Sequence, residues 1–195
     1  GAVRVGLPAG HESNLRMPLD DFWALQALRP ERQFVGDENI IRYARSVKTP
    51  AEVEKIRAAC AVAGRAFDRM GEVLAEGVRK EDYYRGFQRV LLDGYFADYD
   101  RNFSFGKPPR QEVQDAFGTL VDAVDAGFAA AKPGARASDL FAAMDQVVTG
   151  GKNSADSGRF GHGLGLQLTE WPSLIPDEHT VLVEGMVLTL EPSIE

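Results

Sequence analysis

The sequence predicts an α+β protein, and two observations support that fold class. Between residues 49 and 148, apolar side chains recur at helical spacing in several segments that end at glycine or proline. Beyond Gly150-Gly151 the pattern changes to short β-branched runs, as in "TVLVEGMVLTLEPSIE" (180–195). Helices and strands alternate too irregularly for a repeated βαβ unit. An α+β domain is therefore favoured over a parallel α/β fold.

The first third of the chain predicts a short helix, a strand and a long capped helix. "MPLDDFWALQAL" (17–28) has apolar residues at helical spacing, and Asp20 is placed to cap it. "RQFVGDENIIRYARSVKT" (32–49) predicts a strand followed by a connector. Thr49, Pro50 and Glu52 then form a capping box with proline at the first helical position. The apolar stripe of this long helix continues until Gly77 and comprises Val53, Ile56, Cys60, Ala63, Phe67, Met70 and Leu74.

Three further helices are predicted in the middle of the chain. "EDYYRGFQRVLL" (81–92) continues in helical period, and residues 110–132 form a longer helix that ends at Pro133-Gly134. Ser138 is placed to cap a third helix, which continues through Val148. The apolar face expected on the helix over 110–132 is made of Val113, Phe117, Leu120, Val121, Val124 and Phe128.

The bulk properties exclude several partners. A net charge of −7 and a pI near 5.1 argue against binding to nucleic acid, which needs a basic surface. No apolar run reaches membrane-spanning length, so no membrane partner is expected. The single cysteine, Cys60, cannot form an intrachain disulfide and reads as a buried core thiol, which fits a cytoplasmic protein. Because the chain lacks an initiator Met and ends abruptly at Glu195, we expect it to be a piece of a longer protein.

An acidic stretch, "DGYFADYDRNFSFG" (93–106), is the first candidate for chemistry. On an extended strand Asp98 and Asp100 face the same side. Two carboxylates that lie close together repel each other unless a cation, a proton or solvent intervenes. A solvated acidic turn is the alternative interpretation.

The second candidate is "RFGHGLGLQLTEWPS" (159–173), which surrounds His162 with glycines. Glycine allows backbone to approach a ligand closely, and neutral imidazole is a common metal ligand. A phosphate-binding G-x-G-x-x-G pattern is excluded because Leu166 occupies the position of the last glycine. A purely structural histidine is the alternative. His11 and His179 lie in polar stretches and read as surface residues.

The third candidate is "GMVLTLEPS" (185–193), in which Glu191 closes an apolar run before Pro192. A carboxylate at the margin of a core needs a positive partner, or else it reaches solvent at the end of the strand. Taken together, the two carboxylates of Asp98 and Glu191 and the imidazole of His162 are ligands suited to Mn, Zn, Co or Fe. Jointly they predict a metal site.

The three stretches, in this order, resemble the M24 metallopeptidases, a family that includes Xaa-Pro aminopeptidases, prolidases, methionine aminopeptidases and creatinase. "RSVKTPAEVEKIRAACAVA" also resembles the linker and first helix of the family's catalytic domain. The resemblance implies a pita-bread fold over residues 43–195, with a curved antiparallel sheet flanked by helices. It implies that residues 1–42 are the C-terminal tail of a creatinase-like N-terminal domain.

The resemblance also implies the site and its chemistry. Asp98 would bridge two divalent metal ions, His162 and Glu191 would each bind one, and Glu191 and His162 would be the catalytic pair. Glu191 would also handle protons while metal-activated water attacks an amide of a short peptide or peptide-like substrate. Arg101 matches the basic residue that follows the bridging aspartate and would act on the site indirectly. A homodimer is expected as the assembly.

Two family ligands have no match in this chain. The family's upstream aspartate, in a D-x-G setting, falls on Phe87, within the predicted helix. We therefore expect an internal segment to be missing near residues 90–93. Asp93 is a poor substitute because its separation from Asp98 is wrong. The last ligand, a glutamate on a later strand, would fall beyond Glu195, and we expect the C-terminal strands to be missing with it.

A third departure concerns the substrate. Peptidases of the family usually carry a histidine where this chain has Thr169, just before Glu170-Trp171-Pro172. That histidine contacts substrate, so its absence weakens the prediction of a proline-specific peptidase. A creatinase-like C–N hydrolase or lyase on a small molecule is one alternative, and a non-catalytic binding module is the other. The retention of all three ligand residues counts against the binding module.

Overall fold

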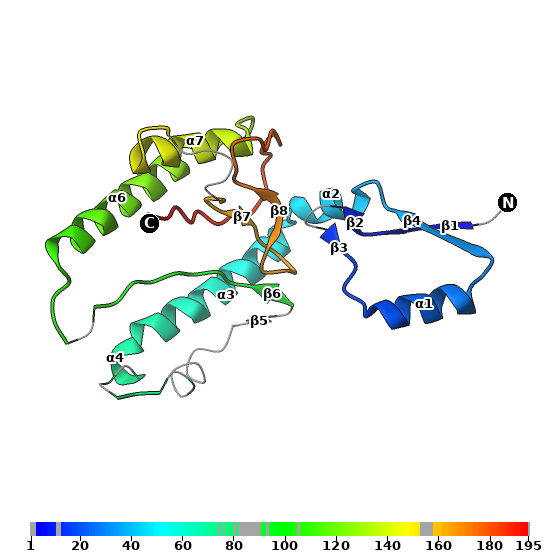
Figure 1. Cartoon of the computed structure of the whole chain (residues 1–195), viewed down its shortest axis with the longest axis horizontal. Helices are drawn as coiled ribbons and strands as arrows, with labels where there is room; N and C mark the ends of the chain where they lie inside the picture. The colour runs from blue at the N-terminus through cyan, green and yellow to red at the C-terminus, as the bar shows by residue number, and fades with distance from the viewer. Residues whose placement is uncertain are drawn as a thin grey trace.

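A computed structural model describes residues 3–10, 13–73, 75, 77–79, 81, 91–92, 94–104, 106–152 and 158–194. It confirms the α+β class (Figure 1). The helices are α1 (Leu19–Leu28), α2 (Ile40–Ser46), α3 (Pro50–Asp68), α4 (Met70–Val73), α6 (Gln111–Ala130) and α7 (Ala137–Val148). The strands are β1 (Val3–Leu7), β2 (Ala9–Gly10), β3 (Ser13–Asn14), β4 (Arg32–Gly36), β5 (Leu91–Leu92), β6 (Tyr95–Phe96), β7 (His162–Gly163) and β8 (Glu170–Ser173).

The strands of the described residues form four two-stranded sheets, not the curved antiparallel sheet that was expected. β1 and β4 pair in parallel, and the pairs β2–β3, β5–β6 and β7–β8 are antiparallel. The strands predicted over 180–191 contribute only isolated bridges, which join Val181, Met186 and Leu188 to other segments.

The start of α3 is built as the sequence predicts. The Thr49 hydroxyl accepts a hydrogen bond from the Glu52 backbone N–H (3.3 Å), and a Glu52 carboxylate oxygen accepts one from the Thr49 N–H (2.8 Å). Pro50 occupies the first helical position. The helix ends at Asp68, and after Arg69 the short helix α4 continues to Val73, so the expected single helix up to Gly77 is interrupted.

The predicted connector after β4 is wrong, because residues 40–46 form helix α2. Asp37 explains the helix start: its carboxylate accepts hydrogen bonds from the N–H groups of Asn39 (3.3 Å) and Ile41 (2.9 Å). These donors would otherwise be unsatisfied at a helix N-terminus. At α1, by contrast, the expected Asp20 cap is not formed; Pro18 is the cap residue, and Asp20 lies in the first turn.

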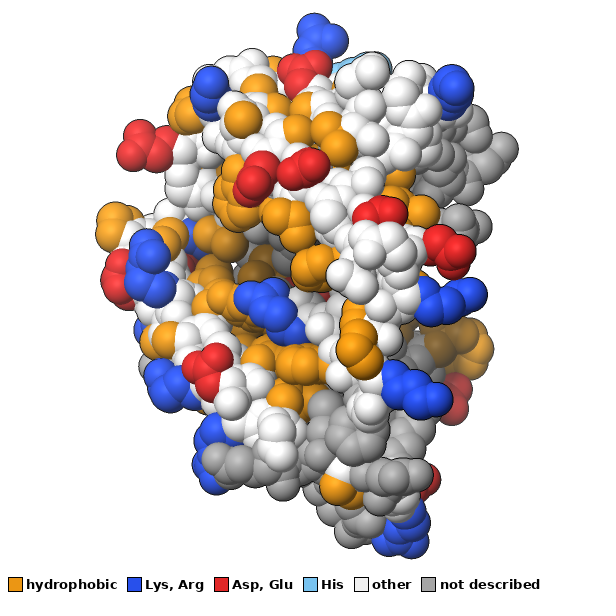
Figure 2. All heavy atoms as spheres, turned by 90° about the vertical axis from the view of Figure 1, so that its left-hand side faces the viewer, with side chains coloured by type: hydrophobic (Ala, Val, Ile, Leu, Met, Phe, Trp, Pro, Cys, Tyr) orange, Lys and Arg blue, Asp and Glu red, His pale blue; other side chains and the backbone are white. Residues whose placement is uncertain are grey.

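α6 occupies the predicted range but turns much of the predicted apolar face to solvent. Val113, Phe117, Val121 and Phe128 are exposed, whereas Ala123 and Gly127 are buried. The small residues face α7 because the two helices pack closely: a Cβ on Gly127 would lie 3.0 Å from the Met144 side chain. Figure 2 shows hydrophobic side chains gathered around a hollow on the face nearest the left of Figure 1.

The other predicted helices differ in their starts. α7 begins at Ala137, with Arg136 rather than Ser138 as its cap residue, and the Asp139 carboxylate accepts from the Arg136 N–H (2.8 Å). Most of the helix predicted over 81–92 lies outside the described residues, as do His11, Phe87 and Asp93. Leu91 and Leu92 form strand β5 instead of helix. The missing segment near 90–93 and the division into residues 1–42 and 43–195 stay predictions.

The described residues from α3 onward contain two hydrophobic clusters. The larger one packs α6 and α7 against the chain around Phe160, Leu174 and Leu182. The smaller one joins Ile56 of α3 to Tyr95 and Leu164. Cys60 is half-buried against this second cluster rather than fully buried, and burial raises the pKa of its thiol. Among the described residues no helix is long and apolar enough to cross a membrane.

Truncation of Leu140 to alanine should cost about 2–5 kcal/mol in the free energy of unfolding, because its fully buried side chain fills the α6–α7 interface. The matched control is Leu28→Ala, which removes the same atoms from a side chain that is 75% exposed and should change stability by less than about 0.5 kcal/mol. Chemical denaturation measures both. Equal losses would show that Leu140 does not lie in the core.

Candidate metal centre

His162 is fixed at the start of β7 by close backbone packing. Its N–H donates to the Thr189 hydroxyl (3.0 Å), and the Thr189 N–H donates to the His162 carbonyl (2.8 Å). This approach requires glycine at the preceding position: Gly161 has φ +141°, and a Cβ there would lie 2.1 Å from the Thr189 carbonyl oxygen. The glycine therefore lets the segment that ends in Glu191 lie directly against the histidine.

One ring nitrogen of His162 is already engaged by the backbone. Nδ1 lies 2.8 Å from the carbonyl oxygen of Gly163, and a carbonyl can only accept, so Nδ1 carries the proton. In the neutral ring this leaves the Nε2 lone pair free. A ring oriented in this way by its second nitrogen is the usual arrangement of a metal-binding histidine.

Two carboxylates face that free nitrogen. Asp98 Oδ2 lies 3.5 Å from Nε2 of the buried His162, and Glu191 Oε1 lies 3.6 Å from it. The ligand atoms of all three residues lie within 4.8 Å of one another. Glu191 is held in place because its N–H donates to the Phe160 carbonyl (2.8 Å), and Asp98 follows β6, whose Phe96 N–H donates to the Gly165 carbonyl (3.1 Å).

The donor set fits a divalent cation. Two carboxylates close to an imidazole lone pair repel one another, and a bound cation removes that repulsion. One nitrogen and two oxygens are the ligand types of Zn, Mn, Co and Fe sites, in which water completes the coordination. The structure thus brings together Asp98, His162 and Glu191, the three residues that the sequence singled out.

Asp100 and Arg101, which follow Asp98 in the sequence, do not lie in the ligand cluster. Asp100 is exposed and lies outside the cluster, although the alternation placed it on the same side as Asp98. The reason is that residues 97–104 form no strand, so the two-residue period does not apply. Arg101 is exposed too; its guanidinium lies 4.9 Å from the centre of the Tyr99 ring and 5.9 Å from that of Phe67.

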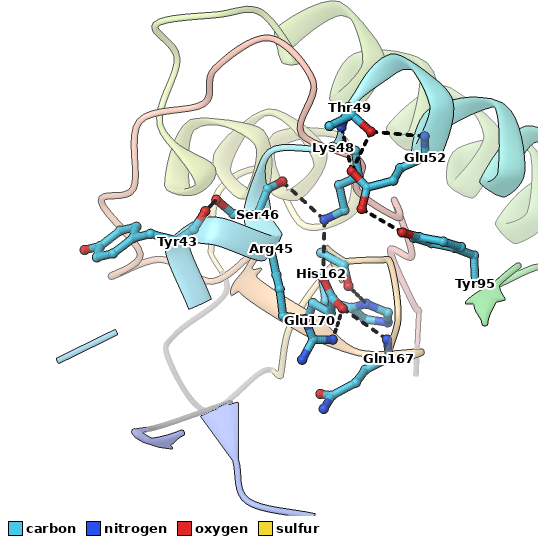
Figure 3. A network of polar contacts seen from close by, with 11 residues as sticks. Tyr43, Arg45, Ser46, Lys48, Thr49, Glu52, Tyr95, His162, Gln167 and Glu170 are labelled. Atoms are coloured by element: carbon cyan, nitrogen blue, oxygen red, sulfur yellow. Dashed lines mark hydrogen bonds and ion pairs between the residues drawn. The ribbon is translucent and has the colours of Figure 1, made fainter. Parts of the chain in front are cut away.

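A network of charged side chains that no sequence pattern predicted lies beside the cluster (Figure 3). The Glu170 carboxylate forms ion pairs with Lys48 Nζ (3.3 Å) and with the Arg45 guanidinium, and it accepts from the Gln167 N–H (3.0 Å). Lys48 and Glu170 are both buried. Burial lowers the pKa of Lys48, an effect that the neighbouring Glu170 carboxylate partly opposes. Charged residues 122 positions apart leave no local sequence signal that predicts such a pair.

A second contact of this network involves the capping box. The Tyr95 hydroxyl donates to Glu52 Oε1 (2.6 Å) while Glu52 Oε2 remains bound to Thr49. These hydrogen bonds, from Tyr95 first and then from Thr49, lower the pKa of Glu52 from 4.5 to about 2. The capping signal in the sequence identified Glu52 but not its long-range partner.

Thr169 lies where a substrate-contacting histidine was expected from the family resemblance. The Arg159 guanidinium donates to its hydroxyl (3.3 Å). A polar side chain with a cationic neighbour thus occupies the position.

Comparison with known proteins shows the family of this chain. The sequence model of the metallopeptidase family M24 matches residues 89–195, which is more than half of the chain. The chain belongs to this family.

Curated relatives extend over more of the chain. The Xaa-Pro dipeptidase of Pyrococcus furiosus is 25% identical over an alignment of 209 positions, gaps included. The alignment covers 84% of this chain and 60% of that protein. The Xaa-Pro dipeptidase of Lactobacillus delbrueckii is 27% identical over an alignment of 221 positions, gaps included. The alignment covers 89% of this chain and 60% of that protein. The Bacillus subtilis protein YkvY is 37% identical over 119 residues, which are 60% of this chain and 32% of its own length. The chain therefore spans about 60% of the length of these dipeptidases.

Solved structures share the fold. The prolidase from Pyrococcus horikoshii superposes with a TM-score of 0.77 at 21% identity, covering 96% of this chain and 65% of that one. The X-Pro aminopeptidase from Thermotoga maritima gives a TM-score of 0.76 at 20% identity, covering 90% and 62%. The described chain thus has the α+β architecture of prolidase structures.

Replacement of Gly163 by alanine should destabilise the protein by about 1–3 kcal/mol, because the new Cβ would lie 2.4 Å from the Trp171 carbonyl oxygen. Gly118→Ala is the control. It lies inside α6 with nothing within 4 Å of its Cβ position, and alanine there should stabilise by about 0.5–1 kcal/mol. Thermal unfolding of both variants tests the contrast, and a neutral Gly163→Ala would contradict the close packing of β7 on β8.

The contribution of Glu52 to stability should depend on pH. Because its pKa is lowered in the folded state, the ionised form stabilises the fold above about pH 4.5, and this stabilisation disappears as the pH falls toward about 2. The difference in the free energy of unfolding between wild type and Glu52→Gln should therefore be largest above pH 4.5 and shrink below it. Urea denaturation from pH 7 to pH 2 measures the difference. A constant difference would refute the charged hydrogen bonds of Glu52.

Proposed function

We propose that the protein is a metal-dependent hydrolase of the Xaa-Pro dipeptidase type, acting on a short peptide or peptide-like amide. The convergence of Asp98, His162 and Glu191 on one point carries this proposal. Membership in the M24 family and the similarity to Xaa-Pro dipeptidases support it. The assigned metal ligands are Asp98, His162 and Glu191, and the assigned catalytic residues are Glu191 and His162.

The geometry suggests a division of labour among the three side chains. His162, buried and oriented through Nδ1, directs Nε2 toward the two carboxylates. Asp98 would be a ligand shared by two ions, as the family resemblance implies. Glu191 is only half-buried, with 34% of its side chain exposed, so it can both ligate and exchange a proton with an incoming group. The ions, when bound, would lower the pKa of water and stabilise the negative charge that develops on the carbonyl oxygen.

Thr169 favours a second candidate, a creatinase-like C–N hydrolase or lyase that acts on a small molecule. The position offers a hydroxyl and the Arg159 guanidinium instead of an imidazole. This pair suits a substrate with an anionic group. Parallel assays with Xaa-Pro dipeptides and with creatine separate the two candidates, because only one class of C–N bond will be cleaved.

Glu191→Ala should lower the rate of Xaa-Pro dipeptide hydrolysis by about 10²-fold or more, since it removes both a ligand and a proton-transfer group. The control is Glu184→Ala, which removes an exposed carboxylate from the neighbouring turn and should leave the rate unchanged. Elemental analysis of the full-length wild-type protein should find about two Mn, Zn, Co or Fe ions per chain. Equal rates for wild type and Glu191→Ala would refute its role, and absence of metal after reconstitution would favour a binding module.

A further inference from the structure

The segment that connects α2 to α3 contacts all three chain segments that carry the candidate metal ligands. We define the linker as residues 45–52, which comprise the end of α2, the connection and the first turn of α3. Figure 3 shows its side chains converging on the region beside His162. Each contact joins elements far apart in the sequence, so together they fix the relative positions of the ligand segments.

Toward the His162 segment, the linker acts through charge. Lys48 Nζ and the Arg45 guanidinium hold the two oxygens of the Glu170 carboxylate. Glu170 in turn faces the glycines that follow the histidine: a Cβ on Gly165 would lie 2.7 Å from Glu170 Oε2, and Gly163 is the register partner of Glu170 across β7 and β8. The carboxylate therefore fills the space against this loop.

Toward the Glu191 segment, the linker acts through its backbone. The Lys48 N–H donates to the Gly185 carbonyl (2.8 Å), and Val47 forms a bridge with Met186. Gly185 has φ +89°, and a Cβ there would lie 2.9 Å from the Lys48 carbonyl oxygen. The segment that ends in Glu191 thus starts from a turn that is fixed against Lys48.

Toward the Asp98 segment, the linker acts through the capping box. Glu52 accepts from the Tyr95 hydroxyl (2.6 Å), three residues before Asp98. The same segment is tied to the loop behind Glu170, because the Phe96 N–H donates to the Gly165 carbonyl (3.1 Å). Glu170 contacts both parts: its carboxylate pairs with Arg45 and Lys48 of the linker and lies against the Gly163–Gly165 backbone.

We propose that Glu170 is a positioning residue for the metal centre, holding the Gly163–Gly165 backbone, and through it His162, in the orientation that binds metal. This inference rests on the proposed function. Glu170 itself is held by Lys48 and Arg45, so these two cations act on the centre through it. The residue is not a ligand, since its oxygens are engaged by Lys48, Arg45 and the Gln167 N–H.

Glu170→Gln tests the proposal, with Glu178→Gln as a matched control. Glu178 is a half-buried carboxylate shortly after β8 that accepts from Trp171 Nε1 (3.0 Å) and the Thr180 N–H (3.0 Å). Lys48→Met is a milder second variant, because it leaves Glu170 paired with Arg45. Two quantities are measured on each protein: the affinity for Co²⁺ with its visible absorption spectrum, and hydrogen exchange of the peptide 161–168 in the metal-free state.

The proposal predicts that Glu170→Gln and Lys48→Met weaken Co²⁺ binding by about tenfold or more and change the Co²⁺ spectrum. Exchange in the peptide 161–168 should become faster in both. Glu178→Gln should leave binding, spectrum and exchange of this peptide as in the wild type. A Glu170→Gln protein that binds Co²⁺ as the wild type does would overturn the proposal, and so would an equal loss in Glu178→Gln.

The same measurements separate a failure of this inference from a failure of the proposed function. Wild-type protein that binds no Co²⁺ refutes the metal centre, and the positioning role then falls with it even if exchange differs between variants. Wild-type protein that binds Co²⁺ with unchanged affinity in Glu170→Gln refutes only the positioning role. Thermal unfolding of each variant confirms that it is folded before binding is measured.

Discussion

The candidate site depends on the close approach of two backbones at Gly161. No side chain fits there, because a Cβ would lie 2.1 Å from the Thr189 carbonyl oxygen. The approach allows two hydrogen bonds between His162 and Thr189, and it places Glu191 two residues beyond the pairing. A histidine and a carboxylate 29 positions apart in the sequence thereby come within 3.6 Å of each other. The other contacts of the site stabilise this approach of the two backbones.

The charges around Glu170 are paired with opposite charges, whereas the ligand cluster brings two carboxylates together at one imidazole. Ion pairs inside a protein recover the cost of desolvation only when their geometry and additional hydrogen bonds are good. Here two cations and a backbone N–H surround one carboxylate, so each oxygen of Glu170 has a partner. Such an arrangement tolerates little displacement, which makes it suited to holding a loop of glycines that has no side chains of its own for packing.

The local elements of the fold were predicted where a short-range signal exists. Thr49, Pro50 and Glu52 specified the start of α3 because capping satisfies donors within three residues. Helix α2 was missed because its initiating group, Asp37, lies outside the helix and gives no periodic apolar pattern. On α6 the apolar pattern was correct for a helix, but the buried face was decided by Gly127 and Ala123, since small residues allow α7 to approach.

The sequence by itself determined the fold class, the family resemblance and the three candidate ligand residues, because motif order and residue chemistry are local properties of the chain. The tertiary structure decided that Asp98, His162 and Glu191 meet at one point while Asp100 and Arg101 do not. It also decided the partners of Glu170, which lie more than a hundred positions away in the sequence, and the Tyr95 partner of Glu52, which lies more than forty positions away. Long-range electrostatic pairs follow from how the chain packs, and packing is a property of the whole fold rather than of any short segment.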